Sequence, residues 1–248
     1  MISSWLFAAL LSVATALTIP DNAQQHLIPA ASPAPAEDTM PTVYESTIMA
    51  RRILSQSSEG TLVTVFPSET ESDDLSTTEN RPKGMAGSPI GLMEYFADCD
   101  STGNPTILAI GIATPFRNYV AGSNISLSVR WWPSQTHIYS ATEDENVPTP
   151  HTPAALPRFS LHGYLEDVDF RDYRNYRVPA CFLAKHPDSV LWQPGNDVHT
   201  SKYVRLVVEH VYWFGGFGDR ARIGWLPMED WRRVTKGEID RMRLPGEK

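Results

Sequence analysis

The alternation of apolar and polar positions predicts a chain built mostly from β-strands. Segments with this strand pattern cover residues 60–66, 88–98, 105–112, 124–132, 158–168, 202–214 and 222–226. Most neighbouring segments are joined by connections of hairpin length, and there are too few helical segments for parallel β-α-β crossovers. The pattern therefore predicts a mainly antiparallel β-barrel with a few helices.

Two segments have a helical pattern instead. In the first, apolar and small side chains recur at i, i+4, i+7 and i+11, namely at Val43, Thr47, Ala50 and Leu54. The second covers residues 179–187, where a proline can occupy the first turn and another marks the end. Arg51 and Arg52 lie partly off the apolar stripe of the first helix, so we expect both on a solvated face.

The N-terminal residues differ from the rest of the chain. Residues 1–16 are apolar, have no charged side chain and end in the small-x-small pattern that signal peptidase cleaves. This segment is typical of a signal peptide, although it has no Lys or Arg, and a buried N-terminal helix is the alternative. Residues 17–40 are rich in Pro and Ala and predict a disordered leader. We expect a single domain over residues 41–248.

Composition narrows the function classes. The chain has 248 residues, 42% of them hydrophobic, which is enough for a sizeable core. Its formal net charge of −8 argues against a general nucleic-acid binder, which needs a basic face. No internal segment reaches the roughly 18 consecutive apolar residues of a membrane span, so we expect no membrane-spanning helix in the mature chain.

If the chain enters the secretory pathway, two cysteines become candidates for a disulfide and one asparagine becomes a candidate for glycosylation. Cys99 and Cys181 could form a disulfide in an oxidising compartment, or remain two buried thiols, and the sequence leaves both open. No C-x-x-C motif is present, so a redox role for them is not expected. Asn124 begins the sequence Asn-Ile-Ser, which predicts an N-glycosylation site if the side chain is exposed.

Two features could bind an anion. The glycines at 215, 216 and 218 do not match the spacing of a dinucleotide-binding loop and are expected to form a turn between two strands. Thr114 and Arg117 follow a strand, and a hydroxyl beside a guanidinium can bind phosphate, although an ordinary polar loop has the same composition. Lys202 begins the last long strand and is a further candidate for contact with an anion.

Four motifs, read in order, resemble one known family. They are "TVYESTIMARRILSQSSEGTLVTV", "GSPIGLMEYFAD", "ACFLAKHPDSVLW" and "HTSKYVRLVVEHVYWFGGFG". Together they resemble the CREG-like proteins, the secreted cellular-repressor glycoproteins, over about residues 41–234. That family shares the FMN-binding split barrel of the pyridoxamine-phosphate oxidases.

The resemblance implies a fold and two competing functions. In the oxidases, Arg, Lys and Ser or Thr side chains of two neighbouring strands hold the flavin phosphate. Thr114, Arg117 and Lys202 are the residues here that could take this role, but the usual dense Ser-Arg-Lys cluster is absent. The resemblance therefore favours a non-catalytic, homodimeric glycoprotein without cofactor, secreted or vacuolar/endolysosomal, with protein or glycan partners unspecified. An FMN-dependent oxidoreductase is the alternative.

Overall fold

The computed structural model describes residues 40–68, 80–133, 153–169, 171, 176–196, 199–216 and 221–247. The proposed signal peptide lies outside these residues, as do Gly218 and all of the proposed leader except Met40. All described residues belong to one compact unit that extends from Thr39 to Lys248.

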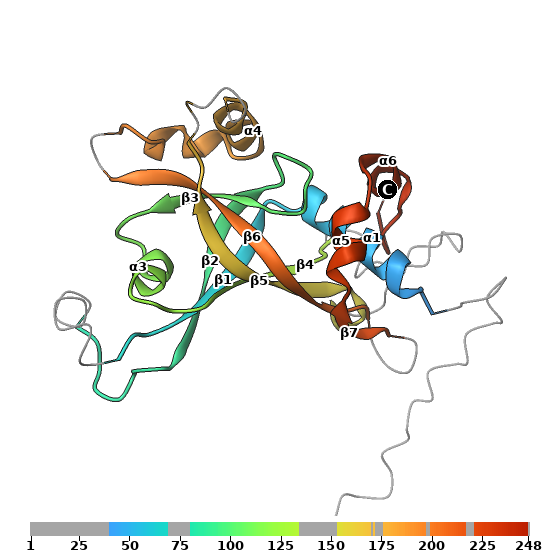
Figure 1. Ribbon diagram of the computed structural model, residues 1–248, viewed down its shortest axis with the longest axis horizontal. Coiled ribbons are helices and arrows are strands. Elements are labelled where there is room, and N and C mark those ends of the chain that lie inside the picture. Colours follow the sequence, from blue (N-terminus) through green and yellow to red (C-terminus); the bar gives the residue numbers. More distant parts are fainter. Residues whose placement is uncertain are drawn as a thin grey trace, which may run out of the picture. The chain divides into compact units, whose positions relative to one another are not determined.

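Among the described residues, seven strands form one antiparallel sheet that closes on itself (Figure 1). The strands are β1 (Glu59–Val65), β2 (Pro89–Ala97), β3 (Thr106–Ile110), β4 (Ile125–Arg130), β5 (Arg158–Asp167), β6 (Ser201–Phe214) and β7 (Ile223–Leu226). Their order is β3-β2-β1-β4-β5-β6-β7, and an additional pairing of β3 with β6 closes six of them into a barrel. The antiparallel β-barrel expected from the pattern is confirmed.

Alternation along the strands places apolar side chains inside the barrel. Leu127 of β4 lies opposite Leu161 of β5, and both are fully buried. Their neighbours Ser128 and Ser160 also lie opposite each other and face outward. Because successive side chains of a strand point to opposite faces, one face is dry and the other carries hydroxyl groups.

A bulge lets the long strand β6 follow β5 around the barrel. The register between β5 and β6 shifts between His162 and Gly163. A Cβ atom at Gly163 would lie only 1.8 Å from the carbonyl oxygen of Val207, so the two backbones approach too closely for any other residue. Bulges of this kind bend and twist the strand that contains them.

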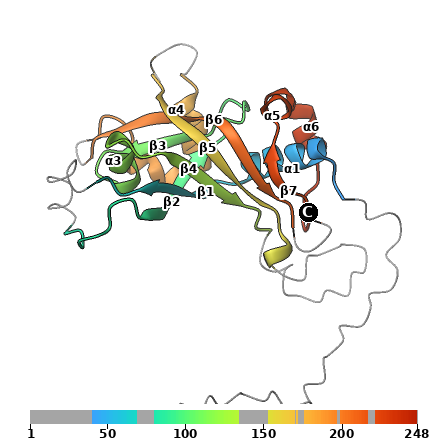
Figure 2. The ribbon, with the colours of Figure 1, turned by 60° about the horizontal axis from the view of Figure 1, so that its bottom comes forward.

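Helices close the two ends of the barrel and cover part of its outside. They are α1 (Val43–Gln56), α3 (Thr114–Val120), α4 (Val178–Lys185), α5 (Met228–Arg233) and α6 (Lys236–Arg241), with 3-10 turns at η2 (Pro153–Ala155) and η3 (Pro187–Trp192). Figures 1 and 2 show α1, α5 and α6 gathered at one end and α3 at the other. None of the helices among the described residues has the length and apolar character that a membrane crossing needs.

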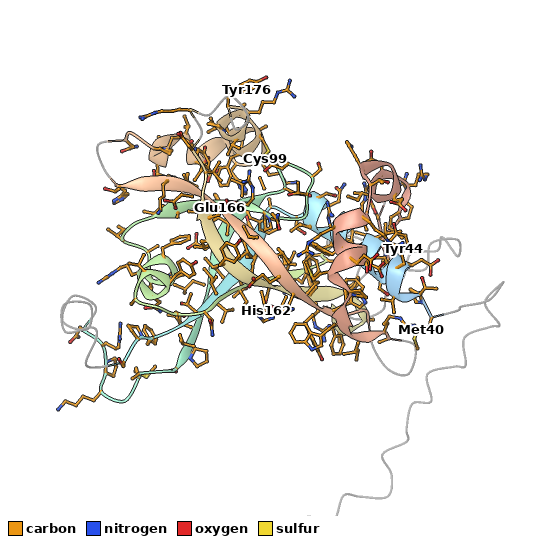
Figure 3. All side chains as sticks on the ribbon, in the orientation of Figure 1. Met40, Tyr44, Cys99, His162, Glu166 and Tyr176 are labelled. Carbon is orange, nitrogen blue, oxygen red and sulfur yellow. A yellow bond between two sulfur atoms is a disulfide. The ribbon has the colours of Figure 1, made fainter. Side chains whose placement is uncertain are left out.

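Capping residues define the starts of α1 and α6, and one of them also links the two helices. Thr42 and Glu45 form a capping box at the start of α1, and Thr235 and Glu238 form another at the start of α6. The hydroxyl of Tyr44, labelled in Figure 3, donates a 2.8 Å hydrogen bond to the Glu238 carboxylate and so ties the two helices together.

The expectation that Arg51 and Arg52 face solvent is wrong. Arg51 is 0% exposed, and its guanidinium donates hydrogen bonds to the carbonyl oxygens of Ser101 (2.5 Å) and Trp231 (2.7 Å). Arg52 is half-buried and pairs with the carboxylate of Glu247. These partners lie far away in the sequence, so the helical pattern around the pair could not reveal them.

The two predicted helices are present as α1 and α4, but the sequence pattern missed α3, α5 and α6. The turn expected at the glycines is present in the described part: β6 and β7 pair as an antiparallel hairpin, and the Gly215 amide donates to the Arg222 carbonyl over 2.8 Å. Gly216 has a φ of +150°, a conformation that glycine adopts readily.

Candidate functional site

Two of the three candidate phosphate-binding residues line one pocket. Arg117 of α3 and Lys202 of β6 border a cavity of about 330 Å³ beside the end of β3. They come together because β3 pairs with β6, with Ala109 opposite Lys202, and α3 follows β3 directly. The chain between them is long, so only closure of the barrel makes them neighbours.

The pocket is poorly suited to a phosphate group. Thr114, the third candidate, is the first residue of α3 and does not line this pocket. The Lys202 ammonium already pairs with the Asp167 carboxylate at 2.6 Å. Most of the remaining wall is apolar or backbone, and its residues are Ala109, Gly111, Phe116, Val120, Ala121, Thr200 and Ser201. The sequence alone gave no sign that Asp167 would compete for Lys202.

Within the described residues, no three His, Cys, Asp or Glu side chains come close enough to hold a metal ion. His162 and His210 lie directly opposite each other on β5 and β6. Burial and the neighbouring His210 lower the pKa of His162, and the indole of Trp225 packs 5.6 Å from the His162 ring. Figure 3 labels His162 on the outside of the barrel.

Cys99 and Cys181 form a disulfide. Their Cα atoms are 5.7 Å apart, within the usual range for such a bridge. Cys99 follows β2 and Cys181 lies in α4, so the bridge fastens this helix to the sheet (Figure 3). Both sulfurs border an apolar cluster that includes Phe182 and Tyr203.

The same helix is held by the motif that carries much of the family resemblance. His186 donates from Nε2 to the Phe96 carbonyl over 2.9 Å, and its ring stacks on Tyr95 with 4.2 Å between the centroids. The Tyr95 hydroxyl donates in turn to Asp188. Lys185 caps the end of α1 by donating to its last carbonyl oxygens. The motif therefore holds α4 and η3 on the barrel.

The predicted glycosylation residue is accessible. Asn124 is exposed and directly precedes β4, whereas the next residue, Ile125, is buried in the core. The Ser123 hydroxyl donates to the Asn124 carbonyl over 2.6 Å, which holds the backbone but leaves the side-chain amide outside. A glycan on Asn124 would project from the barrel without displacing any core residue.

A second, larger cavity was not predicted from the sequence. It measures about 890 Å³ and lies on the outer face of the sheet, over β1, β4, β5 and β6. Arg130 and Arg158 are among the residues that line it. Each lies at the end of its strand segment in the sequence, and only the strand register shows that they are neighbours.

Comparison with solved structures identifies relatives by fold. A heme binding protein from Mycobacterium smegmatis has 20% sequence identity and a TM-score of 0.51; the match covers 77% of this chain and 60% of that protein. A putative pyridoxamine 5'-phosphate oxidase from Listeria innocua has 13% identity and a TM-score of 0.38, with 69% of this chain and 98% of that one covered. At 20% identity, the likeness to the heme binding protein shows the fold alone. A search of curated proteins finds no match.

The family comparison is more specific. The family described as "CREG, beta-barrel" matches residues 41–233, which is most of the chain and nearly the whole described unit. This range contains all seven strands, the disulfide and α4. The chain therefore belongs to the CREG β-barrel family, with the split-barrel fold that the sequence motifs implied.

Proposed function

We propose that this chain is a disulfide-linked glycoprotein of the secretory pathway, secreted or delivered to a vacuolar or endolysosomal compartment, that acts by binding and not by catalysis. The observation that carries the proposal is the Cys99–Cys181 bridge. Disulfides of this structural kind persist in oxidising compartments and are rare where thiols are kept reduced. The apolar N-terminal segment and the exposed Asn124 support the same route.

The pocket at α3 supports a non-catalytic role. A flavin phosphate needs several converging donors, and here Lys202 is paired with Asp167 while Thr114 stands outside the pocket. In the motif "ACFLAKHPDSVLW", the polar side chains of His186 and Asp188 accordingly form contacts that hold α4 and η3 on the barrel.

The test is to express the full chain in a secretory host and to follow it into the medium. We expect a secreted product without its first residues, with one glycan at Asn124 by mass spectrometry and no free thiol after denaturation. Asn124→Gln is the matched control and should lose the glycan alone. A product that stays in the cytosol, or two titratable thiols, would contradict the proposal.

An FMN-dependent oxidoreductase is the second candidate. The observation that favours it is that Arg117 and Lys202 line one pocket of about 330 Å³. The test is to titrate the purified protein with FMN. Because the barrel also has the fold of a heme binding protein, a second titration should use hemin. Flavin or heme that remains with the purified protein on gel filtration, and is lost in Arg117→Ala, would favour this candidate over the first.

We also propose that the chain forms a homodimer, as the family resemblance implies. Sedimentation equilibrium should then give twice the mass of the glycosylated chain at micromolar concentration. A monomer throughout the concentration range would refute this part of the proposal without affecting the secretory route.

A further inference from the structure

The outer face of the sheet contains a continuous row of side chains across five strands. Met93, Thr61, Ser128, Ser160 and Tyr212 lie opposite one another in turn on β2, β1, β4, β5 and β6. The three central members are short hydroxyl side chains, whereas Met93 and Tyr212 are long. All five line the cavity of about 890 Å³. The row therefore forms a floor of hydroxyl groups between two higher walls.

Two arginines stand at one edge of this floor. Arg130 of β4 and Arg158 of β5 lie directly opposite each other. Like charges in this position destabilise a strand pair, so an uncompensated pair calls for an explanation. Within the described residues, neither guanidinium forms an ion pair with a carboxylate.

Aromatic rings hold both guanidinium groups in place. Arg130 lies over the ring of Trp132 at 4.7 Å, and Arg158 lies over the ring of Phe214 at 3.9 Å from its centroid. One nitrogen of Arg158 also donates to the carbonyl oxygens of Ala154 and Leu156. Stacking fixes the direction of a guanidinium while leaving N–H groups at its edge to bind an anion.

The charge of the cavity favours an anionic ligand. Among the described residues that line it, Glu59 is the one carboxylate, against the two arginines. Its volume is within the range of about 300–1,000 Å³ that ligand pockets occupy. A floor of hydroxyl groups favours a polyhydroxylated ring over a flat apolar one, because Thr61, Ser128 and Ser160 can each donate and accept.

We propose that this cavity binds an anionic carbohydrate, with its acidic group on Arg130 and Arg158 and its hydroxyl groups on Thr61, Ser128 and Ser160. The acidic group is a phosphate or a carboxylate, both of which match the planar fork of arginine. The site is separate from the pocket of Arg117 and Lys202, and it does not depend on the secretory route or on the absence of flavin.

The test is calorimetric titration of the full chain, made in a secretory host and freed of its own N-glycan with an endoglycosidase. The probes are glucose 6-phosphate, glucuronate, glucose, inorganic phosphate and a short acidic peptide. We expect saturable binding of at least one anionic sugar, about tenfold or more tighter than that of glucose. Glucose has no acidic group and therefore lacks the charge-assisted hydrogen bonds to the two arginines. Inorganic phosphate or the peptide binding as tightly as the sugars would overturn the assignment to carbohydrate.

Single substitutions test whether the sugar binds in this cavity. Arg130→Gln is the cleanest change, since this guanidinium donates no hydrogen bond to any residue that the structure describes. It should weaken the binding of anionic sugars about tenfold while leaving that of glucose unchanged. Ser160→Ala should weaken both kinds of sugar. Arg117→Gln, on the other pocket, is the matched control and should bind like the parent. Equal affinities for the parent, Arg130→Gln and Arg117→Gln, or no sugar binding at millimolar concentration, would refute the proposal.

Discussion

Removing the Cys99–Cys181 bridge should cost a large part of the stability of the barrel. The bridged residues are 82 positions apart in the sequence, and closing a loop of that length lowers the entropy of the unfolded chain by about 15 cal/mol/K. At 25 °C this corresponds to about 4.5 kcal/mol. Since domains unfold with about 5–15 kcal/mol, the reduced chain should unfold at a much lower denaturant concentration.

The structure also indicates which substitution to make. Both cysteines border the apolar cluster of Phe182 and Tyr203, so alanine is preferable to serine, which would place a hydroxyl there. The double variant Cys99→Ala/Cys181→Ala loses a few sulfur contacts in addition to the bridge. The parent treated with a reductant loses the bridge alone, and comparing the two separates these contributions.

The assay is urea unfolding followed by tryptophan fluorescence for the oxidised parent, the reduced parent and the double variant. We expect both forms without the bridge to lose about 3–5 kcal/mol, with a larger dependence on urea because their unfolded chains are more expanded. A loss below about 1 kcal/mol in both forms would refute the view that the bridge constrains the unfolded chain.

Three further predictions concern single residues. Arg51→Met should lower stability by about 3–5 kcal/mol in urea unfolding, because it leaves the carbonyl oxygens of Ser101 and Trp231 without their buried donor. It also removes the positive charge near the half-buried carboxylate of Asp98, and a loss under about 1 kcal/mol would contradict this reasoning. Gly163→Ala should cost at least about 2 kcal/mol or prevent folding, because the new Cβ meets the Val207 carbonyl; unchanged stability would contradict the bulge. Burial raises the pKa of Glu94 to about 7, so this carboxyl binds more protons in the folded state and stability falls as pH rises from about 4.5 to about 7. Glu94→Gln should therefore stabilise the chain by about 1–3 kcal/mol at pH values above about 7, and it should have little effect near about pH 4. Equal effects on stability at both pH values would contradict the raised pKa of Glu94.

The strands could be predicted because their information is local. Leu127 and Leu161 alternate with Ser128 and Ser160 within a few residues, so the period is visible in the sequence. Helices α3, α5 and α6 span six or seven residues each, which is too short for a helical period to stand out. The burial of Arg51 could not be predicted locally, because its acceptors are carbonyl oxygens of Ser101, in a turn after β2, and of Trp231, in α5.

The candidate sites needed information that only the register provides. Arg117 and Lys202 share a pocket because β3 pairs with β6, and the sequence pattern gives no order for the strands of a barrel. Arg130 and Arg158 lie in two separate predicted strands, 124–132 and 158–168, so nothing in the sequence links them. Asn124 and the cysteines were easier to identify, because a sequon and a cysteine pair are recognised by residue type alone.

The residues that reveal the family are not those that could give this chain its function. His186, Lys185 and Asp188 use their polar groups to hold α4 and η3 on the barrel, so their presence in a sequence reports how the fold is stabilised. Arg130 and Arg158 place two like charges opposite each other, which weakens a strand pair, although both guanidinium groups stack on aromatic rings and Arg158 donates to backbone carbonyls. A chain can belong to this family through the first group and still differ from its relatives in what it binds through the second. The outer face over β4 and β5, and not the family motif, is therefore where a specific ligand should be sought.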